Sequence, residues 1–180
     1  MNFFQEHIGR YLLKLRSKHT QRKLHVNNFE TAHSIAIMYH ETSKTQAQKV
    51  MQFAQYIAHT YAETSISIMA FRALNKGKQV YKTEDFSKTI ITQNDFSWYG
   101  TAKSATLEKF IQTPFDILID LSMEEIFPLQ YILQLSHASF KIGKLNSTLH
   151  YDFMIDVKNE KNIDFLIQQI SVYLPSLKQK

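Results

Sequence analysis

Residues 34–71, SIAIMYHETSKTQAQKVMQFAQYIAHTYAETSISIMAF, contain the pattern that decides the fold. The runs SIAIMY (34–39) and SISIMAF (65–71) are short and apolar, which is typical of buried β-strands. The segment 44–62 between them can be capped by Thr42 or Ser43, and its apolar residues are spaced as one face of a helix: Val50, Phe53, Ala54, Ile57 and Tyr61. A strand, a helix and a strand joined by short connections predict a βαβ unit, in which the two strands are parallel.

The second half of the chain repeats this alternation. Two apolar strands, FDILIDL (115–121) and YDFMIDV (151–157), share an aromatic–Asp start and an Ile–Asp pair. Predicted helices follow at 125–137 and 162–174, and a short strand begins at 140. We therefore expect an α/β fold: a three-layer sandwich with a mostly parallel sheet of about five strands, Rossmann-like or flavodoxin-like.

The stretch 74–103 has the least regular pattern. Its features are a turn at 75–78 (NKGK), short edge strands at 80–81 and 89–92, and an aromatic loop at 96–100 (FSWYG). A helix is predicted next, at 104–112.

The net charge of the chain lies in its first 29 residues. Six of the 21 Lys and Arg residues occur there against one acid, Glu6, so the segment carries +5, and the remaining 15 Lys and Arg face 15 Asp and Glu. We therefore divide the chain into a basic amphipathic N-terminal helix with its linker (1–29) and a single α/β domain (30–180).

The basic segment is predicted to be helical over 3–23. Its apolar stripe consists of Phe4, Ile8, Tyr11, Leu12 and Leu15. Because the stripe ends at Leu15, we expect the last two turns to project from the body or to lie on a partner.

The composition excludes several kinds of site. The chain has no cysteine, so disulfides, thiolate metal sites and cysteine nucleophiles are absent. It shows neither a long apolar run nor the pattern of a signal peptide, so we expect a cytoplasmic protein. No histidine lies in a metal-binding motif and no GxSxG elbow is present, so we predict no metal site, no cofactor and no catalytic residue.

The carboxyl edge of a parallel sheet is where ligands bind, so the loop after the first strand is a candidate site. That loop, HETSKT (40–45), contains no glycine and therefore lacks both dinucleotide-binding and P-loop motifs. The candidate ligand-site residues at this edge are His40, Thr42, Ser43, Asp120 and Ser122. Asp120 and Asp156 can bind a metal or act as a base, or they can simply cap turns and helices.

The aromatic loop suggests a second kind of contact. Trp98 and Tyr99, with Phe96 beside them, can stack on a base or a sugar, or they can anchor the loop to the core.

Four stretches of the chain resemble an uncharacterised family of short α/β proteins common in Bacteroidota: FSWYG (96–100), PFDILIDLS (114–122), FPLQYILQLSHASFKIG (127–143) and YDFMIDV (151–157). The resemblance covers about residues 34–175, with a variable basic lead-in, and it implies no catalytic residues. An Asp-containing strand, a helix and a short strand ending in Ile–Gly are also similar to the N-terminal half of heptosyltransferase-type glycosyltransferases. At 180 residues the chain is too short to include the second, sugar-nucleotide-binding domain of those enzymes.

Our functional hypothesis is based on the basic segment. A cluster of one sign attracts polyanions, and arginine forms bidentate contacts with phosphate. We expect a non-catalytic RNA-binding protein, associated with the ribosome through ribosomal RNA and possible contacts with ribosomal proteins. Its RNA-binding residues would be Arg10, Lys14, Arg16, Lys18, Arg22 and Lys23. The alternatives are a small enzyme or sensor that binds a nucleotide or sugar phosphate at the sheet edge, and a peripheral membrane protein.

Overall fold

A computed structural model of the chain describes residues 3–18, 20–74, 88–146, 151–157, 160 and 162–177. Within these residues six parallel strands form one sheet in the order β3-β2-β1-β4-β5-β6. The strands are β1 (Ser34–His40), β2 (Ser65–Phe71), β3 (Lys88–Ile91), β4 (Ile117–Asp120), β5 (Phe140–Lys144) and β6 (Phe153–Ile155). The helices are α1 (Phe3–Ser17), α2 (Lys44–Thr60), α3 (Ala105–Gln112), α4 (Phe127–Leu135) and α5 (Ile163–Tyr173), with short 3-10 turns at Gln93–Asp95 and Leu174–Ser176.

The predicted fold class and βαβ unit are confirmed. β1 and β2 pair in parallel from Ser34 opposite Ser65 to His40 opposite Phe71. Ser43 caps α2 by accepting a hydrogen bond from the backbone N–H of Gln46. The sheet has one strand more than the five expected, because the short edge strand predicted at 89–92 joins it as β3. The features predicted at 75–78 and 80–81 lie outside the described residues.

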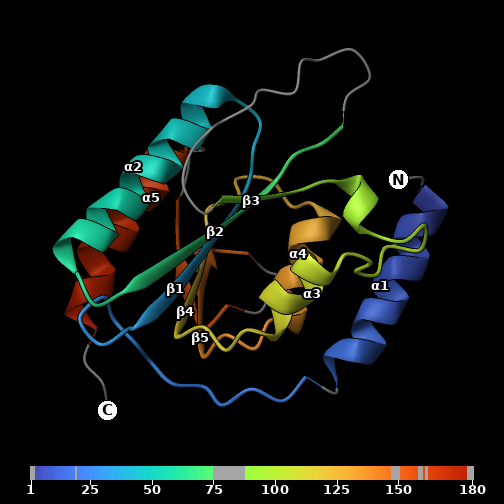
Figure 1. Ribbon diagram of the computed structural model, residues 1–180, viewed down its shortest axis with the longest axis horizontal. Coiled ribbons are helices and arrows are strands. Elements are labelled where there is room, and N and C mark those ends of the chain that lie inside the picture. The colour runs from blue at the N-terminus through green and yellow to red at the C-terminus, as the bar shows by residue number, and fades with distance from the viewer. Residues whose placement is uncertain are drawn as a thin grey trace.

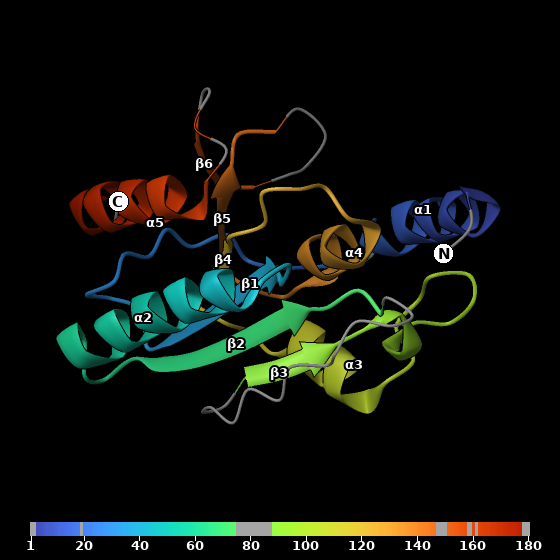
Figure 2. The same cartoon turned by 90° about the horizontal axis from the view of Figure 1, so that it is seen from above.

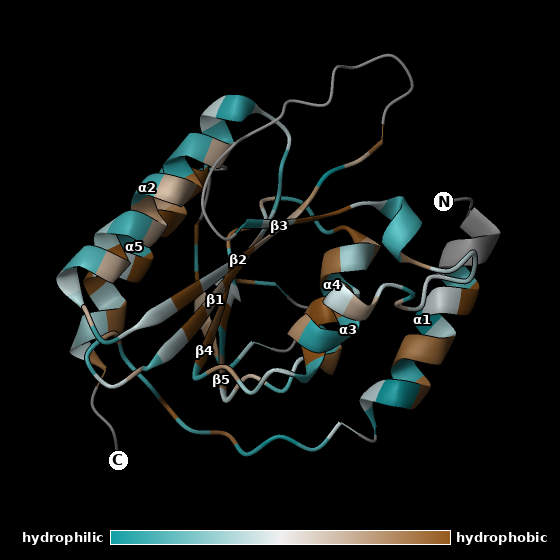
Figure 3. Ribbon diagram, in the orientation of Figure 1, coloured by the Kyte–Doolittle hydropathy of each residue, from teal (hydrophilic) through white to brown (hydrophobic). Residues whose placement is uncertain are grey.

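The sheet is covered on both faces, as Figures 1 and 2 show. Successive residues of β1 point to opposite faces, so Ile35 and Ile37 pack with α2 and α5, and Ala36 and Met38 pack with α3 and α4. Figure 3 shows that the side of α2 turned away from the sheet is largely hydrophilic. The strands are therefore buried on both faces, which explains their nearly continuous apolar sequences.

The basic helix α1 packs against α4 and forms the outermost element of its layer (Figure 1). It ends at Ser17 rather than at residue 23, and Leu13 is its buried apolar anchor. Tyr11 and Leu15, which were predicted to lie on the apolar stripe, are 65% and 42% exposed. The helix ends before the turns that were expected to project, and Arg22 in the segment after it binds Asp152, so that expectation is wrong for the residues that the structure describes.

A glycine sets the orientation of α1. A Cβ added to Gly9 would lie 2.8 Å from Cζ of Phe127 and 2.9 Å from the backbone oxygen of Tyr99. The opposing loop makes a matching approach at Gly100, whose φ of +83° is readily adopted by glycine. The absence of side chains at these two positions lets the helix backbone approach the loop and α4, and this contact turns Tyr11 and Leu15 to solvent.

Substitution of Gly9 by alanine should weaken this contact. The added methyl group meets a backbone oxygen, which cannot move as a flexible side chain would, so Gly9→Ala should lower the free energy of unfolding by about 1–3 kcal/mol. Urea denaturation measures the change. Leu15→Ala, at an exposed position of the same helix, is the control and should cost much less. Equal stability of Gly9→Ala and the parent protein would show that α1 does not pack this closely.

Candidate nucleic-acid interface and ligand sites

Two arginines of α1 are directed at α4. Arg10 donates a 2.7 Å hydrogen bond to Oε1 of Gln130, and its guanidinium carbon lies 5.7 Å from the ring centroid of Phe127. Arg16 donates to the hydroxyl of Tyr131 at 3.0 Å. These contacts orient both arginines against α4.

Arg22 has a different role from the one predicted. Its guanidinium binds both carboxylate oxygens of Asp152, at 2.8 and 2.5 Å, and also donates to the backbone oxygen of Ser139 at 3.1 Å. This bidentate ion pair ties the segment after α1 to the loops flanking β5. By contrast, Lys14, Lys18 and Lys23 are exposed.

A cationic cavity of about 470 Å³ lies between α1, α4 and β5. Four of its lining residues are basic: Arg10, Lys14, Arg22 and Lys141. None of the described residues that line it is acidic; its other lining residues are Leu13, Ser17, Thr20 and Gln134. The arrangement suits an anion such as a phosphate group.

Lys141 was not among the residues predicted for a site. It belongs to β5, is 3% exposed, and donates a 2.6 Å hydrogen bond to the backbone oxygen of Leu133. Burial, and then the positive charge of Arg22, lower the pKa of Lys141 to about 7, while Asp152 acts in the opposite direction. The available signal was a single lysine within the otherwise apolar run FKIG.

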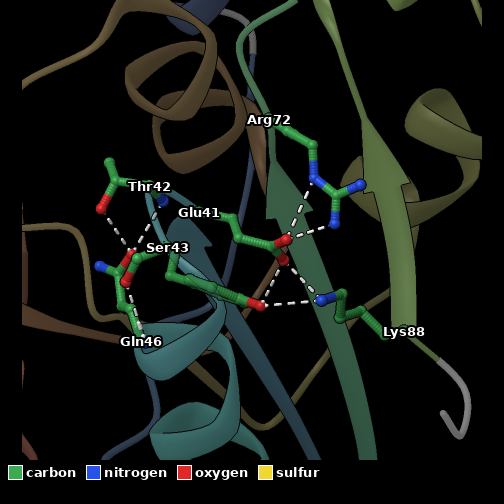
Figure 4. A network of polar contacts seen from close by, with 7 residues as sticks. Glu41, Thr42, Ser43, Gln46, Arg72 and Lys88 are labelled. Atoms are coloured by element: carbon green, nitrogen blue, oxygen red, sulfur yellow. Dashed lines mark hydrogen bonds and ion pairs between the residues drawn. The ribbon is translucent and has the colours of Figure 1, made fainter. Parts of the chain in front are cut away.

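The strand order reverses between β1 and β4, and the predicted ligand-site residues lie on either side of this point. Thr42 and Ser43 form hydrogen bonds with Gln46 at the start of α2. The backbone N–H of Thr42 donates to Oε1 of Gln46 at 2.9 Å, and Ser43 accepts from the Gln46 N–H at 3.2 Å (Figure 4). His40 points to the other face of the sheet, so the structure does not bring the three residues into one site.

Asp120 lies in a closed polar pocket. Its carboxylate accepts 2.8 Å hydrogen bonds from the backbone N–H of Ser122 and from the hydroxyl of Tyr151. Burial raises the pKa of Asp120, and the bonds from Ser122 and Tyr151 oppose that rise. The cavity beside it measures only about 10 Å³. This carboxylate therefore holds the loop after β4 and Tyr151 in place, and the pocket has no room for a substrate.

A second buried carboxylate, Glu41, lies at the carboxyl end of β1 (Figure 4). It binds two cations: Arg72, after β2, donates from Nε at 3.1 Å and from a terminal nitrogen, and Lys88, at the start of β3, donates from Nζ. The hydroxyl of Tyr39 donates to it at 2.8 Å. Burial acts to raise the pKa of Glu41, but the hydrogen bonds from Lys88, Arg72 and Tyr39 outweigh it and lower the pKa. The network joins the first three strands of the chain at this edge.

A larger cavity, of about 480 Å³, opens at the carboxyl end of β1, β2 and β3. Its lining residues are His40, Phe71, Ala73, Gln93, Phe96, Ser97, Trp98, Glu125, Ile126, Phe127 and Pro128. Trp98 belongs to it and is 63% exposed, whereas Tyr99 does not line it and packs edge-on against the Trp98 ring at 5.2 Å. The structure thus brings His40 and Trp98 together in one cavity.

Within the described part of the chain, no group of three His, Asp or Glu side chains is placed to hold a metal ion. Among the same residues, no helix has the length and apolar character needed to cross a membrane.

A family model matches residues 3–177 of the chain, which include α1 as well as the sheet. The chain belongs to a family of unknown function, DUF6913. The resemblance to an uncharacterised family is therefore confirmed, and the matched region reaches well before residue 34, so the basic helix is part of the family's domain. No curated protein and no solved structure is significantly similar to the chain.

The Glu41 network gives a stability prediction. Glu41→Gln would leave Arg72 and Lys88 without their carboxylate in a buried setting, and should lower the free energy of unfolding at pH 7 by about 3 kcal/mol. Because the pKa of Glu41 is lowered by folding, the stabilisation is complete above about pH 4.5, the value of an unfolded glutamate, and is lost as the pH falls further. Urea denaturation at several pH values should therefore show the parent protein and Glu41→Gln converging in acid. Glu63→Gln, at an exposed position, should match the parent protein throughout; an equally stable Glu41→Gln would contradict the network.

Proposed function

We propose that the protein binds RNA through its phosphate backbone and catalyses no reaction, with ribosomal RNA as its target. The observation that supports this is the cationic cavity beside α1. Arg10, Lys14, Arg22 and Lys141 line one polar space, and of these four Arg22 already forms an ion pair with Asp152. A phosphate group placed there would accept charge-assisted hydrogen bonds from more than one element of the fold.

The charge around the cavity favours an extended polyanion over a single small anion. Lys14, Lys18 and Lys23 are exposed, Arg16 is held at the surface by Tyr131, and the segment up to residue 29 carries the entire net charge. Contacts of this kind recognise phosphates and not base sequence, so binding should be strongly dependent on salt. The proposal also includes a cytoplasmic location and contacts between the α/β body and ribosomal proteins.

Lys14 of α1 and Lys18, which directly follows that helix, provide the first test. The double substitution of Lys14 and Lys18 by glutamine should weaken binding to a structured ribosomal RNA fragment and reduce the slope of log affinity against log salt by about two. Fluorescence anisotropy over a salt series measures both. Neither lysine is part of the packing between α1 and α4, so thermal stability should be unchanged.

The matched control is the double substitution of Lys44 and Lys109 by glutamine, which changes the net charge equally at exposed positions outside α1. It should leave the slope as in the parent protein. Equal loss in both variants would show that net charge alone drives binding. Flotation with vesicles of anionic lipid provides the other comparison. Stronger binding to the vesicles than to RNA would favour the peripheral-membrane hypothesis, in which the exposed side chains of Tyr11 and Leu15 would insert into the lipid surface.

Lys141 provides a test by pH. A bound phosphate favours the protonated amine, and because the pKa of Lys141 is about 7 in the free protein, RNA affinity should rise as the pH falls from about 8 to about 6. The other charged groups that face Lys141 are Arg10, Lys14, Arg22 and Asp152. Lys141→Met should lower affinity several-fold at pH 6 and flatten the pH profile. A profile that stays as steep in Lys141→Met would exclude Lys141 from the site.

Protein stability distinguishes this effect from misfolding. The unfolded chain binds a proton at Lys141 up to about pH 10.5, whereas the folded chain releases it near pH 7, so Lys141 makes stability rise with pH between these values. Lys141→Met removes this dependence and should be no less stable than the parent protein at pH 7.

The alternative proposal is a small enzyme or sensor that binds a nucleotide or sugar phosphate, in line with the likeness to the N-terminal half of heptosyltransferases. The cavity of about 480 Å³ beside His40 favours it, because a ligand site at the carboxyl edge is where an α/β sheet usually has one. A thermal-shift screen with nucleotides and sugar nucleotides would detect such a ligand.

A further inference from the structure

The cavity beside His40 has flat apolar walls. Phe71 is the last residue of β2, Phe96 lies in the loop after β3, and Phe127 and Pro128 begin α4. Its volume of about 480 Å³ lies within the range of small-molecule sites. The walls therefore suit a planar, largely apolar group.

Polar groups are present at a few points of this cavity. Nδ1 of His40 is buried and makes no hydrogen bond within the described residues, although it lies 3.4 Å from a carboxylate oxygen of Glu124. Oε1 of Gln93 accepts the backbone N–H of Leu74 at 2.9 Å, which fixes the orientation of that amide. Ser97 and Glu125 complete the polar part of the lining. Donors and acceptors around an apolar slot match the edge of a heterocyclic base.

The cavity does not suit phosphate. No lysine or arginine is among its described lining residues, and Glu125 places a carboxylate there. A nucleotide bound at this place would insert its base and keep its phosphate outside.

Trp98 supplies a surface on which such a base can stack. Its ring is 63% exposed and is supported edge-on by Tyr99 at 5.2 Å. Stacking of a base on an aromatic side chain is tolerant of sequence, because every base has a flat π-face. We propose that the cavity between His40 and Trp98 binds a single unstacked nucleobase, carried either by an RNA strand or by a free nucleotide.

The same cavity adjoins the basic helix. Phe127 lines the cavity and also lies beneath the guanidinium of Arg10, at 5.7 Å, and Gly9 packs against the backbone of Tyr99. A strand whose phosphates lie along α1 would therefore pass close to the mouth of the cavity. The RNA form of this inference rests on the proposed RNA binding, and the free-nucleotide form does not.

Trp98 makes the inference directly measurable, because it is the only tryptophan in the chain. Its fluorescence would be recorded while the protein is titrated with a single-stranded RNA of about ten nucleotides, with an abasic backbone of equal length, and with the four free nucleoside monophosphates. We expect quenching by the base-bearing RNA or by at least one free nucleotide, and none by the abasic backbone. Anisotropy of the labelled oligonucleotides reports binding independently.

Two variants locate the effect. Ala73→Leu places a larger side chain in the cavity, and should abolish the quenching and weaken base-dependent binding by about tenfold. Ala62→Leu is the same substitution at an exposed turn after α2, and should behave as the parent protein. Trp98→Ala changes an exposed side chain and should reduce the anisotropy-derived affinity for the base-bearing RNA towards that for the abasic backbone.

The outcomes separate this inference from the proposed function. If both oligonucleotides bind equally well and no ligand changes Trp98 fluorescence, the cavity is not a base site, while RNA binding through phosphates stands. If neither oligonucleotide binds but a free nucleotide quenches Trp98 in the parent protein and not in Ala73→Leu, RNA binding fails and the base site stands.

Discussion

The structure depends on the parallel pairing of β1 with β2 on one side and with β4 on the other. Residues 35–39 of β1 have no exposed surface, so apolar helices must cover the sheet on both faces. The strand order reverses at this strand, and the chains leaving β1 and β4 therefore diverge at the carboxyl edge. The large aromatic cavity lies along that edge, on the side of β1, β2 and β3.

The buried charged groups differ in how completely they are compensated. Glu41 receives hydrogen bonds from Arg72, Lys88 and Tyr39, which makes it a structural link between strands. The amine of Lys141 donates to the backbone oxygen of Leu133 and lines a cavity with other cations. A buried charge with few partners is costly unless a ligand or a shift in protonation compensates it. Because Glu41 is fully compensated and Lys141 is not, the cavity beside α1 is the site on which the proposed function is based, and the Glu41 network is not.

The similar strands FDILIDL and YDFMIDV illustrate what a sequence pattern reveals and what it leaves open. The first aspartate of each serves the same purpose: Asp116 accepts the backbone N–H of Ser34 at 2.9 Å, and Asp152 accepts that of Lys141 at 2.8 Å. The second aspartates differ, because Asp120 is closed in by Tyr151, and Asp156 follows an edge strand. The pattern was therefore a good guide to strands, whereas the neighbours of each carboxylate came from distant segments.

Local sequence patterns were enough to predict the α/β class, the parallel βαβ unit and the inward face of α2, because hydrophobic periodicity is a local property that burial in the sheet reinforces. They also placed the net charge before residue 30. No such pattern could show that α1 packs on α4 through Gly9, that Arg22 is bound by Asp152, or that His40 and Trp98 share a cavity apart from Thr42 and Asp120. Those features arise from contacts between segments far apart in the chain. Whether two such segments meet depends on the path of the backbone and on the side chains of both, and no local sequence pattern contains this information.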